Sequence, residues 1–196
     1  MLHEILEKIK EFADKAHGDQ TRKYTPERYI VHPVRVMNIL TAYTDDTAVL
    51  AAALLHDVLE DTSTTVEDIR NFLSPILEDQ EVDKTVRLTI ELTDVYTKVN
   101  YPRLNRRQRK NKEVERLHLI SAEGQTIKYA DILDNSIEIV EQDPDFAKVF
   151  LHEAKSILRK MDKGHLELYE KVYHTVDALL EQLRKIKEDG GSFKIH

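Results

Sequence analysis

The stretch AAALLHDVLEDTSTT, residues 51–65, decides which fold this chain can adopt. Five small or apolar residues lead into His56 and Asp57, and Glu60 and Asp61 follow one helical turn later. Alanine and leucine in an unbroken run favour a helix that is buried on all sides. A buried helix that carries one histidine and three carboxylates within six positions needs a chemical reason.

These polar residues have the spacing of metal ligands on a helix. Each residue of an α-helix advances by about 100°, so positions four apart share a face. His56 therefore shares a face with Glu60, and Asp57 shares one with Asp61. Because an isolated buried carboxylate costs several kcal/mol even after relaxation, the pattern predicts a divalent cation. His56 and Asp57 would be its ligands, and Glu60 and Asp61 would lie beside its water.

Two residues outside this stretch are candidate ligands for the same ion. His32 precedes Pro33, and a residue before proline prefers an extended conformation, so we expect its ring to project from the end of a loop. Asp131 lies in KYADILDN, residues 128–135, with Asn135 one helical turn further on. Two imidazoles and two carboxylates without sulfur suit manganese, iron or zinc better than calcium.

Apolar residues recur at helical spacing along nearly the whole chain, and the period of two that marks strands is almost absent. Pro33 is expected at the first position of its helix, where no amide hydrogen bond is lost. Thr64 and Glu67 are expected to form a capping box, and Gly190 and Gly191 to end the last helix. The pattern predicts an all-α protein with helices at residues 2–17, 33–43, 46–59, 64–73, 82–94, 106–120, 124–141, 145–161 and 164–188.

The composition is that of an ordered globular protein. The 196 residues include 41% hydrophobic side chains, five glycines, five prolines and no cysteine. No repeat, low-complexity tract or linker divides them, so we expect one domain over residues 1–196. The absence of cysteine excludes disulfides, zinc–thiolate sites and a thiol nucleophile. The charged N-terminal segment is unlike a signal peptide and no apolar run could span a bilayer, so a cytoplasmic protein is expected.

The charge is acidic overall but unevenly distributed. A net charge of −7 argues against general nucleic-acid binding, which depends on clustered cations. Residues 98–116 differ, with eight lysines or arginines and two glutamates. Such a run is commonly a solvated helix face, but it could also hold the phosphates of a small polyanion. Both interpretations stay open at this point.

The order His32, His56-Asp57, Asp131 resembles the ligand pattern of the HD-domain metal-dependent phosphohydrolases. The resemblance extends to the hydrolase domain of RelA/SpoT-type alarmone enzymes over residues 12 to about 140. We expect helices at residues 145–188 to complete the bundle. The segments that carry the resemblance are AHGDQTRKYTPERYIVHPVRV (16–36), AAALLHDVLEDTSTT (51–65), LTDVYTK (92–98), RQRKNKEVERLHLI (107–120) and IKYADILDN (127–135).

The resemblance implies a stand-alone small alarmone hydrolase. Such an enzyme uses Mn²⁺, or another divalent transition metal, to remove the 3′-pyrophosphate from guanosine tetra- or pentaphosphate (ppGpp or pppGpp), which gives GDP or GTP and pyrophosphate. The implied metal ligands are His32, His56, Asp57 and Asp131. The implied catalytic residues, which orient and deprotonate the attacking water, are Glu60 and Asp61. The implied substrate-binding residues are Arg22 and Lys23, near the guanine and a phosphate, and Asn135, at the nucleoside.

Three positions depart from the family pattern. Ile132 stands where a basic residue is usual, Ser136 where leucine or methionine is common, and Asp19 where glycine is frequent. Because residues near Asn135 shape the nucleoside pocket, a phosphohydrolase of another nucleotide, such as NADPH or a nucleoside phosphate, is an alternative. A catalytically inactive alarmone sensor is a second alternative. The expected partner is a guanine nucleotide, with no nucleic acid and no membrane, and the sequence leaves homo-oligomer formation open.

Overall fold

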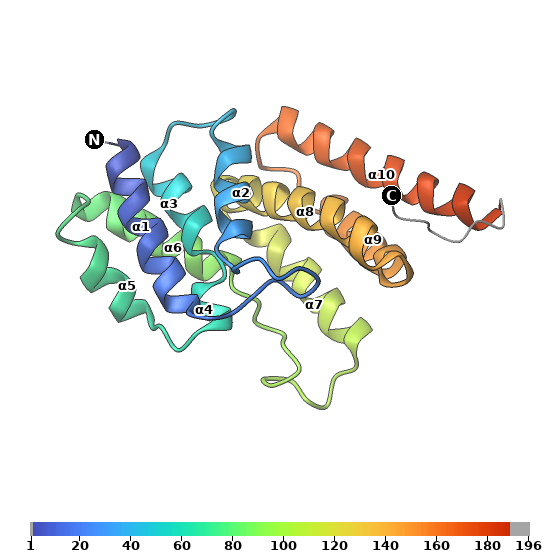
Figure 1. Cartoon of the computed structure of the whole chain (residues 1–196), viewed down its shortest axis with the longest axis horizontal. Coiled ribbons are helices and arrows are strands. Elements are labelled where there is room, and N and C mark those ends of the chain that lie inside the picture. The colour runs from blue at the N-terminus through green and yellow to red at the C-terminus, as the bar shows by residue number, and fades with distance from the viewer. Residues whose placement is uncertain (1, 189–196) are drawn as a thin grey trace.

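The structure is a computed structural model that describes residues 2–188 (Figure 1). Within that range it contains helices and no strand, so the all-α prediction is confirmed. The helices are α1 (Leu2–His17), α2 (Val31–Leu40), α3 (Thr47–Leu55), α4 (Val58–Asp61), α5 (Val66–Leu73), α6 (Asp79–Leu92), α7 (Arg106–Leu119), α8 (Ala122–Gln142), α9 (Pro144–Leu158) and α10 (Leu166–Glu188). No helix among residues 2–188 is both long enough and apolar enough to cross a membrane.

Helix α3 is the centre of the core. It packs against α1, α2, α6 and α8, and every residue from Ala48 to Leu55 is buried. A helix with neighbours on all sides cannot carry a polar face, which explains its unbroken run of alanine, valine and leucine. Burial of each large side chain in this run contributes about 1.5–3 kcal/mol. The expectation of a buried helix leading into His56 is therefore confirmed.

Helices α8, α9 and α10 form a second group that packs on α2 and α3 through α8 (Figure 1). Leu168, Val172 and Val176 of α10 are fully buried against this group, as helical spacing predicts for a core-facing stripe. Leu166, the first residue of the same helix, is 66% exposed and lies outside this stripe. Gly190 and Gly191 lie outside the described residues.

The predicted continuous helix at residues 46–59 is wrong, because the helix is interrupted at His56 and Asp57. The backbone carbonyl of Ala53 accepts a hydrogen bond from Nδ1 of His56 at 2.7 Å. This side-chain bond competes with the helical bond that the same carbonyl would otherwise accept from the amide of Asp57. The chain then resumes as the short helix α4, which carries Glu60 and Asp61.

Several predicted helix starts are also displaced, among them those of α2 and α8. Helix α2 begins at Val31, so His32 lies inside its first turn and does not project from an extended loop, and Pro33 is the third helical residue. Helix α8 begins before Gly124, because its N-cap is Ser121. The amide groups of the first helical turn have no acceptor within the helix. Pro33, which lacks an amide hydrogen, is therefore tolerated at the third position of α2 as well as at the predicted first position.

The capping box of α5 also differs from the predicted one. Thr65 accepts a hydrogen bond from the amide of Asp68 at 3.2 Å, and the Asp68 carboxylate accepts one from the amide of Thr65 at 2.8 Å. The expected pair of Thr64 and Glu67 is therefore wrong by one residue. The segment TTVED contains two overlapping versions of the motif, and the residue pattern alone does not distinguish them.

Candidate functional site

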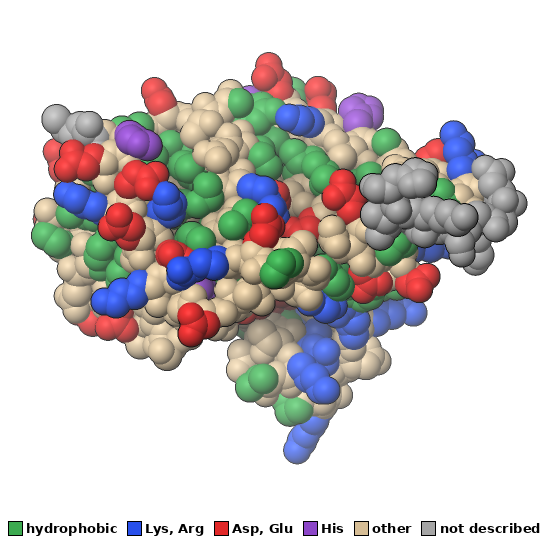
Figure 2. Space-filling view, viewed as in Figure 1, with side chains coloured by type: hydrophobic (Ala, Val, Ile, Leu, Met, Phe, Trp, Pro, Cys, Tyr) green, Lys and Arg blue, Asp and Glu red, His purple; other side chains and the backbone are tan. Residues whose placement is uncertain are grey.

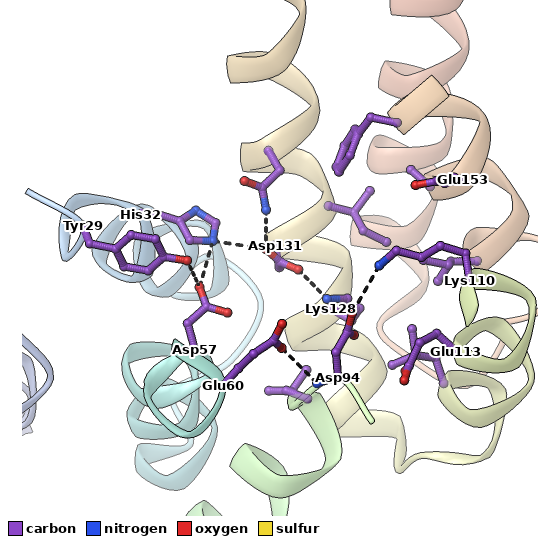
Figure 3. A pocket seen from close by; sticks show the side chains of 17 residues that line it. Tyr29, His32, Asp57, Glu60, Asp94, Lys110, Glu113, Lys128, Asp131 and Glu153 are labelled. Atoms are coloured by element: carbon purple, nitrogen blue, oxygen red, sulfur yellow. Dashed lines mark hydrogen bonds and ion pairs between the residues drawn. The ribbon is translucent and has the colours of Figure 1, made fainter. Parts of the chain in front are cut away.

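A cavity of about 180 Å³ opens between α2, α4, α7, α8 and α9 (Figure 3). One wall carries Tyr29, His32, Asp57 and Glu60, and the opposite wall carries Lys110, Glu113 and Glu153. Helix α8 contributes Lys128, Asp131 and Asn135 between the two walls, at positions one helical turn apart. Segments distant in the chain thus supply an acidic side and a partly basic side of one cavity.

The structure brings the four candidate metal ligands together. Nε2 of His32 lies 3.1 Å from Oδ1 of Asp131 and 3.7 Å from Oδ2 of Asp57. Nε2 of His56 lies 3.0 Å from Oδ2 of Asp57 and 3.8 Å from Oδ1 of Asp131. Both imidazoles are almost completely buried. Two ring nitrogens and two carboxylates therefore converge on one point at the acidic side of the cavity.

The electrostatics of this cluster are those of a cation site. Burial alone would lower the pKa of His32, but hydrogen bonds to Asp131 and Asp134 outweigh it and raise this pKa to about 9. Burial likewise opposes a charge on His56, yet the neighbouring charge of Asp57 raises the pKa of that imidazole. Burial would raise the pKa of Asp57, but the charge of His56 lowers it below its ordinary value. The carboxylates thus stabilise positive charge at this point.

The outer side of the His56 ring is also arranged for metal binding. Nδ1 of His56 contacts the Ala53 carbonyl at 2.7 Å, and a carbonyl only accepts, so this nitrogen carries the proton. Nε2 of His56 is buried and makes no hydrogen bond. Metal-binding histidines commonly donate one ring N–H to such an acceptor while the other nitrogen faces the ion. The residues present therefore fit a divalent cation, and the group His32, His56 and Asp57 has the required proximity.

Glu60 lines the cavity, and its neighbour Asp61 is not among the lining residues. Oε2 of Glu60 accepts a hydrogen bond from the amide of Asp94 at 3.0 Å. The protein atoms around the carboxyl group, followed by the negative charges of Asp94 and Asp57, raise the pKa of Glu60 to about 7. Both residues are exposed, but only Glu60 has its carboxylate in the lining of the cavity. The two predicted catalytic residues thus occupy different environments.

The three candidate substrate residues also differ from one another. Asn135 lines the cavity, and its amide group donates to Oδ1 of Asp131 at 2.6 Å. Arg22 lies behind it and donates to Oδ1 of Asn135 at 3.0 Å, and its guanidinium is 5.5 Å from the centre of the Tyr29 ring. Lys23 is exposed, and its ammonium donates to the hydroxyl of Tyr24 at 2.7 Å. Of the three, only Asn135 lines the cavity.

Sequence reasoning missed Tyr29 and Lys128, which contact the two carboxylates of the cluster. Tyr29 donates its hydroxyl to Oδ2 of Asp57 at 2.7 Å. Lys128 pairs with Oδ2 of Asp131 at 2.7 Å, and the charges of Asp131 and Asp94 raise the pKa of this buried lysine despite the opposing effect of burial. Lys128 could have been found, because it lies one helical turn before Asp131. Tyr29 carried no such signal.

The basic segment at residues 98–116 forms α7 and the loop before it, where lysine and arginine side chains gather on a projecting part of the molecule (Figure 2). Lys110 lines the cavity, with Nζ 3.2 Å from Oδ2 of Asp94. Arg106 makes two hydrogen bonds to Glu153, at 2.9 and 2.7 Å. The segment is therefore partly neutralised, and Lys110 is its cation within the cavity.

The sequence matches a family model described as HD domain over residues 10–120. Guanosine-3′,5′-bis(diphosphate) 3′-pyrophosphohydrolase MESH1 of Homo sapiens is 38% identical over 129 residues, which cover 64% of this chain and 64% of the relative. The corresponding protein of Xenopus tropicalis is 41% identical over 93 residues, which cover 41% of this chain and 51% of the relative. The chain therefore spans less than two thirds of the length of these relatives.

A solved structure of a metazoan ortholog of SpoT that hydrolyzes ppGpp resembles this fold with a TM-score of 0.68. The match covers 95% of this chain and 96% of the other chain at 24% sequence identity. At this level of identity, the likeness shows that the two proteins share a fold.

Proposed function

Because this chain belongs to the HD domain family, we propose that it is a metal-dependent hydrolase that removes the 3′-pyrophosphate from ppGpp and pppGpp. The names of its MESH1 relatives support this substrate class. One observation carries the proposal: His32, Asp57 and Asp131 open into the same cavity as Glu60. A cation site and a carboxylate with a raised pKa within one cavity are the elements that metal-assisted hydrolysis requires. The cysteine-free sequence is compatible with the cytoplasmic location that we propose with it.

His32, His56, Asp57 and Asp131 would hold a divalent transition metal. We propose Mn²⁺, because a mixed set of nitrogen and oxygen donors without sulfur suits this ion. When bound, the ion would supply Lewis acidity that lowers the pKa of water and polarises a phosphoryl oxygen. The hydrogen bond from Tyr29 to Asp57 and the ion pair of Lys128 with Asp131 would fix the two carboxylates in place.

Glu60 would accept the proton of the attacking water. A general base is most effective when its pKa lies near the working pH, and the pKa of Glu60 is raised to about 7. The amide of Asp94 holds Oε2 of Glu60, which leaves the other carboxylate oxygen available for water. Asp61, the next residue and an exposed one, would orient the same water from the solvent side.

The substrate would lie between the acidic and basic sides of the cavity. Lys110 would pair with phosphate charge, since ammonium–phosphate hydrogen bonds are among the stronger ones available to a protein. Asn135 would contact the nucleoside. Arg22 and Lys23 would approach the guanine and a phosphate from the edge of the cavity. Arg22 would also hold the side-chain oxygen of Asn135 in place.

A hydrolase of another phosphorylated nucleotide, such as NADPH, is the second candidate. The observation that favours it is the place of Ile132, which lines the cavity at a position where the family usually has a basic residue. An apolar wall there removes one charge that would otherwise select among nucleotides.

The experiment that tests the proposal is turnover of a nucleotide panel by the Mn²⁺-loaded protein. The panel contains ppGpp, pppGpp, NADPH and GTP, and released pyrophosphate and orthophosphate are measured separately. Pyrophosphate and GDP from ppGpp are the expected products. Orthophosphate from NADPH, with ppGpp left intact, would favour the second candidate. Saturable ppGpp binding without turnover would identify an inactive alarmone sensor.

A further inference from the structure

His32 makes a second contact, on the side of its ring that faces away from Asp57 and Asp131. Its Nδ1 atom lies 2.6 Å from Oδ2 of Asp134, one helical turn beyond Asp131 on α8. The His32 side chain is 1% exposed and that of Asp134 is 9% exposed. A hydrogen bond this short between buried groups fixes the ring in its plane.

Asp134 is itself held from the opposite side. Nε of Arg35 donates to its Oδ1 atom at 2.7 Å, so the two carboxylate oxygens have different partners. The guanidinium of Arg35 also reaches Oε2 of Glu138 at 2.5 Å, and Glu138 accepts from Arg22 at 2.8 Å. Asp134 therefore cannot turn away from His32 without breaking an ion pair in a mostly buried network.

The contact determines which nitrogen of His32 faces the candidate metal site. The guanidinium of Arg35 pairs with Oδ1 of Asp134 at 2.7 Å, so Asp134 is a carboxylate and only accepts hydrogen bonds. Nδ1 of His32 must then donate the proton, which leaves the opposite ring nitrogen, Nε2, directed at Asp131 and Asp57.

The two imidazoles of the site are consequently not equivalent. His56 donates its Nδ1 proton to a neutral backbone carbonyl, whereas His32 donates to a carboxylate. A carboxylate partner makes an imidazole a more basic ligand than a carbonyl does. The network thus strengthens His32 in particular.

We propose that Asp134 is a positioning residue of the metal site, which orients and polarises His32 so that Nε2 faces the ion. The inference rests on the metal site of the proposed function, and it adds a residue that acts only through His32. Loss of such an outer partner typically weakens metal binding about 10- to 100-fold.

The test is a double-mutant cycle on Zn²⁺ affinity, measured by competition with a chromophoric chelator. Zn²⁺ binds nitrogen and oxygen sites more tightly than Mn²⁺, so binding stays measurable after one histidine is removed. The four proteins are the unmodified chain, Asp134→Asn, His32→Ala and the double variant. Asp177→Asn is the matched control, because Asp177 also pairs with a cation, Lys155, but lies outside the cavity.

We expect Asp134→Asn to weaken Zn²⁺ binding about 10- to 100-fold in the unmodified chain, and less than about twofold when His32 is already alanine. The control should bind Zn²⁺ like the unmodified chain. A role in folding alone, or a long-range charge effect, would persist without His32, so an equal loss in both backgrounds overturns the inference. Unchanged binding by Asp134→Asn overturns it as well.

If the Asp134→Asn variant does not fold, Asp134→Ala replaces it in the same cycle. The design also separates failure of this inference from failure of the proposed function. The affinity measurement uses no nucleotide, so an inactive protein whose Zn²⁺ binding follows the cycle would refute the proposed hydrolysis and leave the inference standing. An unmodified chain that binds no Zn²⁺ would refute both.

Discussion

Nε2 of His56 lies 3.0 Å from Oδ2 of Asp57, although the two residues are consecutive in the chain. On a continuous helix, consecutive side chains point about 100° apart and do not meet. They meet here because α3 ends at Leu55 and α4 begins at Val58. The interruption of the helix therefore brings both side chains to one point.

Replacement of Asp57 tests the metal site most directly. Oδ2 of Asp57 lies within 3.7 Å of both candidate histidine nitrogens, so Asp57→Ala should abolish retention of Mn²⁺ and turnover together. Metal content after gel filtration, measured by elemental analysis, checks this. Asp83→Ala, which removes a carboxylate from an exposed ion pair, is the control and should retain the ion. An Asp57→Ala protein that keeps the metal would remove Asp57 from the ligand set.

Glu60→Gln should separate metal binding from catalysis. The glutamine keeps the size of the side chain but cannot accept a proton, and removal of a general base typically lowers the rate about 10²- to 10⁴-fold. The metal content should be unchanged, because Glu60 bonds to the amide of Asp94 and to none of the four candidate ligands. Single-turnover kinetics with ppGpp measure the effect. Near-normal turnover would assign the base to another residue.

Stability of the metal-free protein should depend on pH through Glu60. Its pKa is raised to about 7 in the folded protein and is about 4.3 in an unfolded chain. Between these values the folded state binds more protons than the unfolded state, so the free energy of unfolding falls as pH rises through this window. Urea unfolding at pH 5 and pH 7.5 should show a steeper fall for the unmodified chain than for Glu60→Gln. Parallel pH dependences would show that this pKa is not raised.

Charge reversal on α7 should affect substrate binding only where the side chain faces the cavity. Lys110→Glu should raise KM for ppGpp about tenfold or more, since a hydrogen bond to a charged group is worth roughly 1.5–3 kcal/mol. Arg109 donates to the carbonyl of Leu104, so Arg109→Glu should alter KM less. Arg107→Glu, on an exposed position of the same helix, is the control. Equal effects of the three variants would indicate a general surface charge effect.

Core packing on α6 should account for much of the stability. Leu88 is fully buried, and its replacement by alanine should lower the free energy of unfolding by about 2–5 kcal/mol. Ile90 lies on the same helix and is 48% exposed. Ile90→Ala should therefore change the free energy of unfolding by about 0.5 kcal/mol or less. Chemical denaturation of both variants provides the comparison. Similar losses would mean that the two positions are packed alike.

The presence of the helices was predictable from the sequence, because it depends on the spacing of apolar residues along each local segment. The bounds of α1 agree with the predicted residues 2–17, and the buried run that forms α3 was recognisable from its composition. The interruption at His56 was not predictable, because it depends on a side-chain bond to the Ala53 carbonyl that competes with an equally available helical bond.

The candidate site was predictable where spacing along one helix decides it, as for Asp131 and Asn135. Contacts between segments that are distant in the chain were not. Asp134 meets His32 across 102 positions of sequence, and Tyr29 meets Asp57 across 28. Such contacts follow from the packing of α2 and α3 with α8, which no local pattern encodes.

The complete burial of α3 has a consequence for how occupancy of the site can be detected. The helix ends one residue before His56, and four other helices pack around it. A ligand that binds His56 therefore restrains the end of α3, the central helix of the core. Because such a ligand binds only the folded protein, its binding raises the free energy of unfolding and the melting temperature. Calorimetric or dye-based thermal scans can consequently screen ions and nucleotides against this protein without any assay of chemistry.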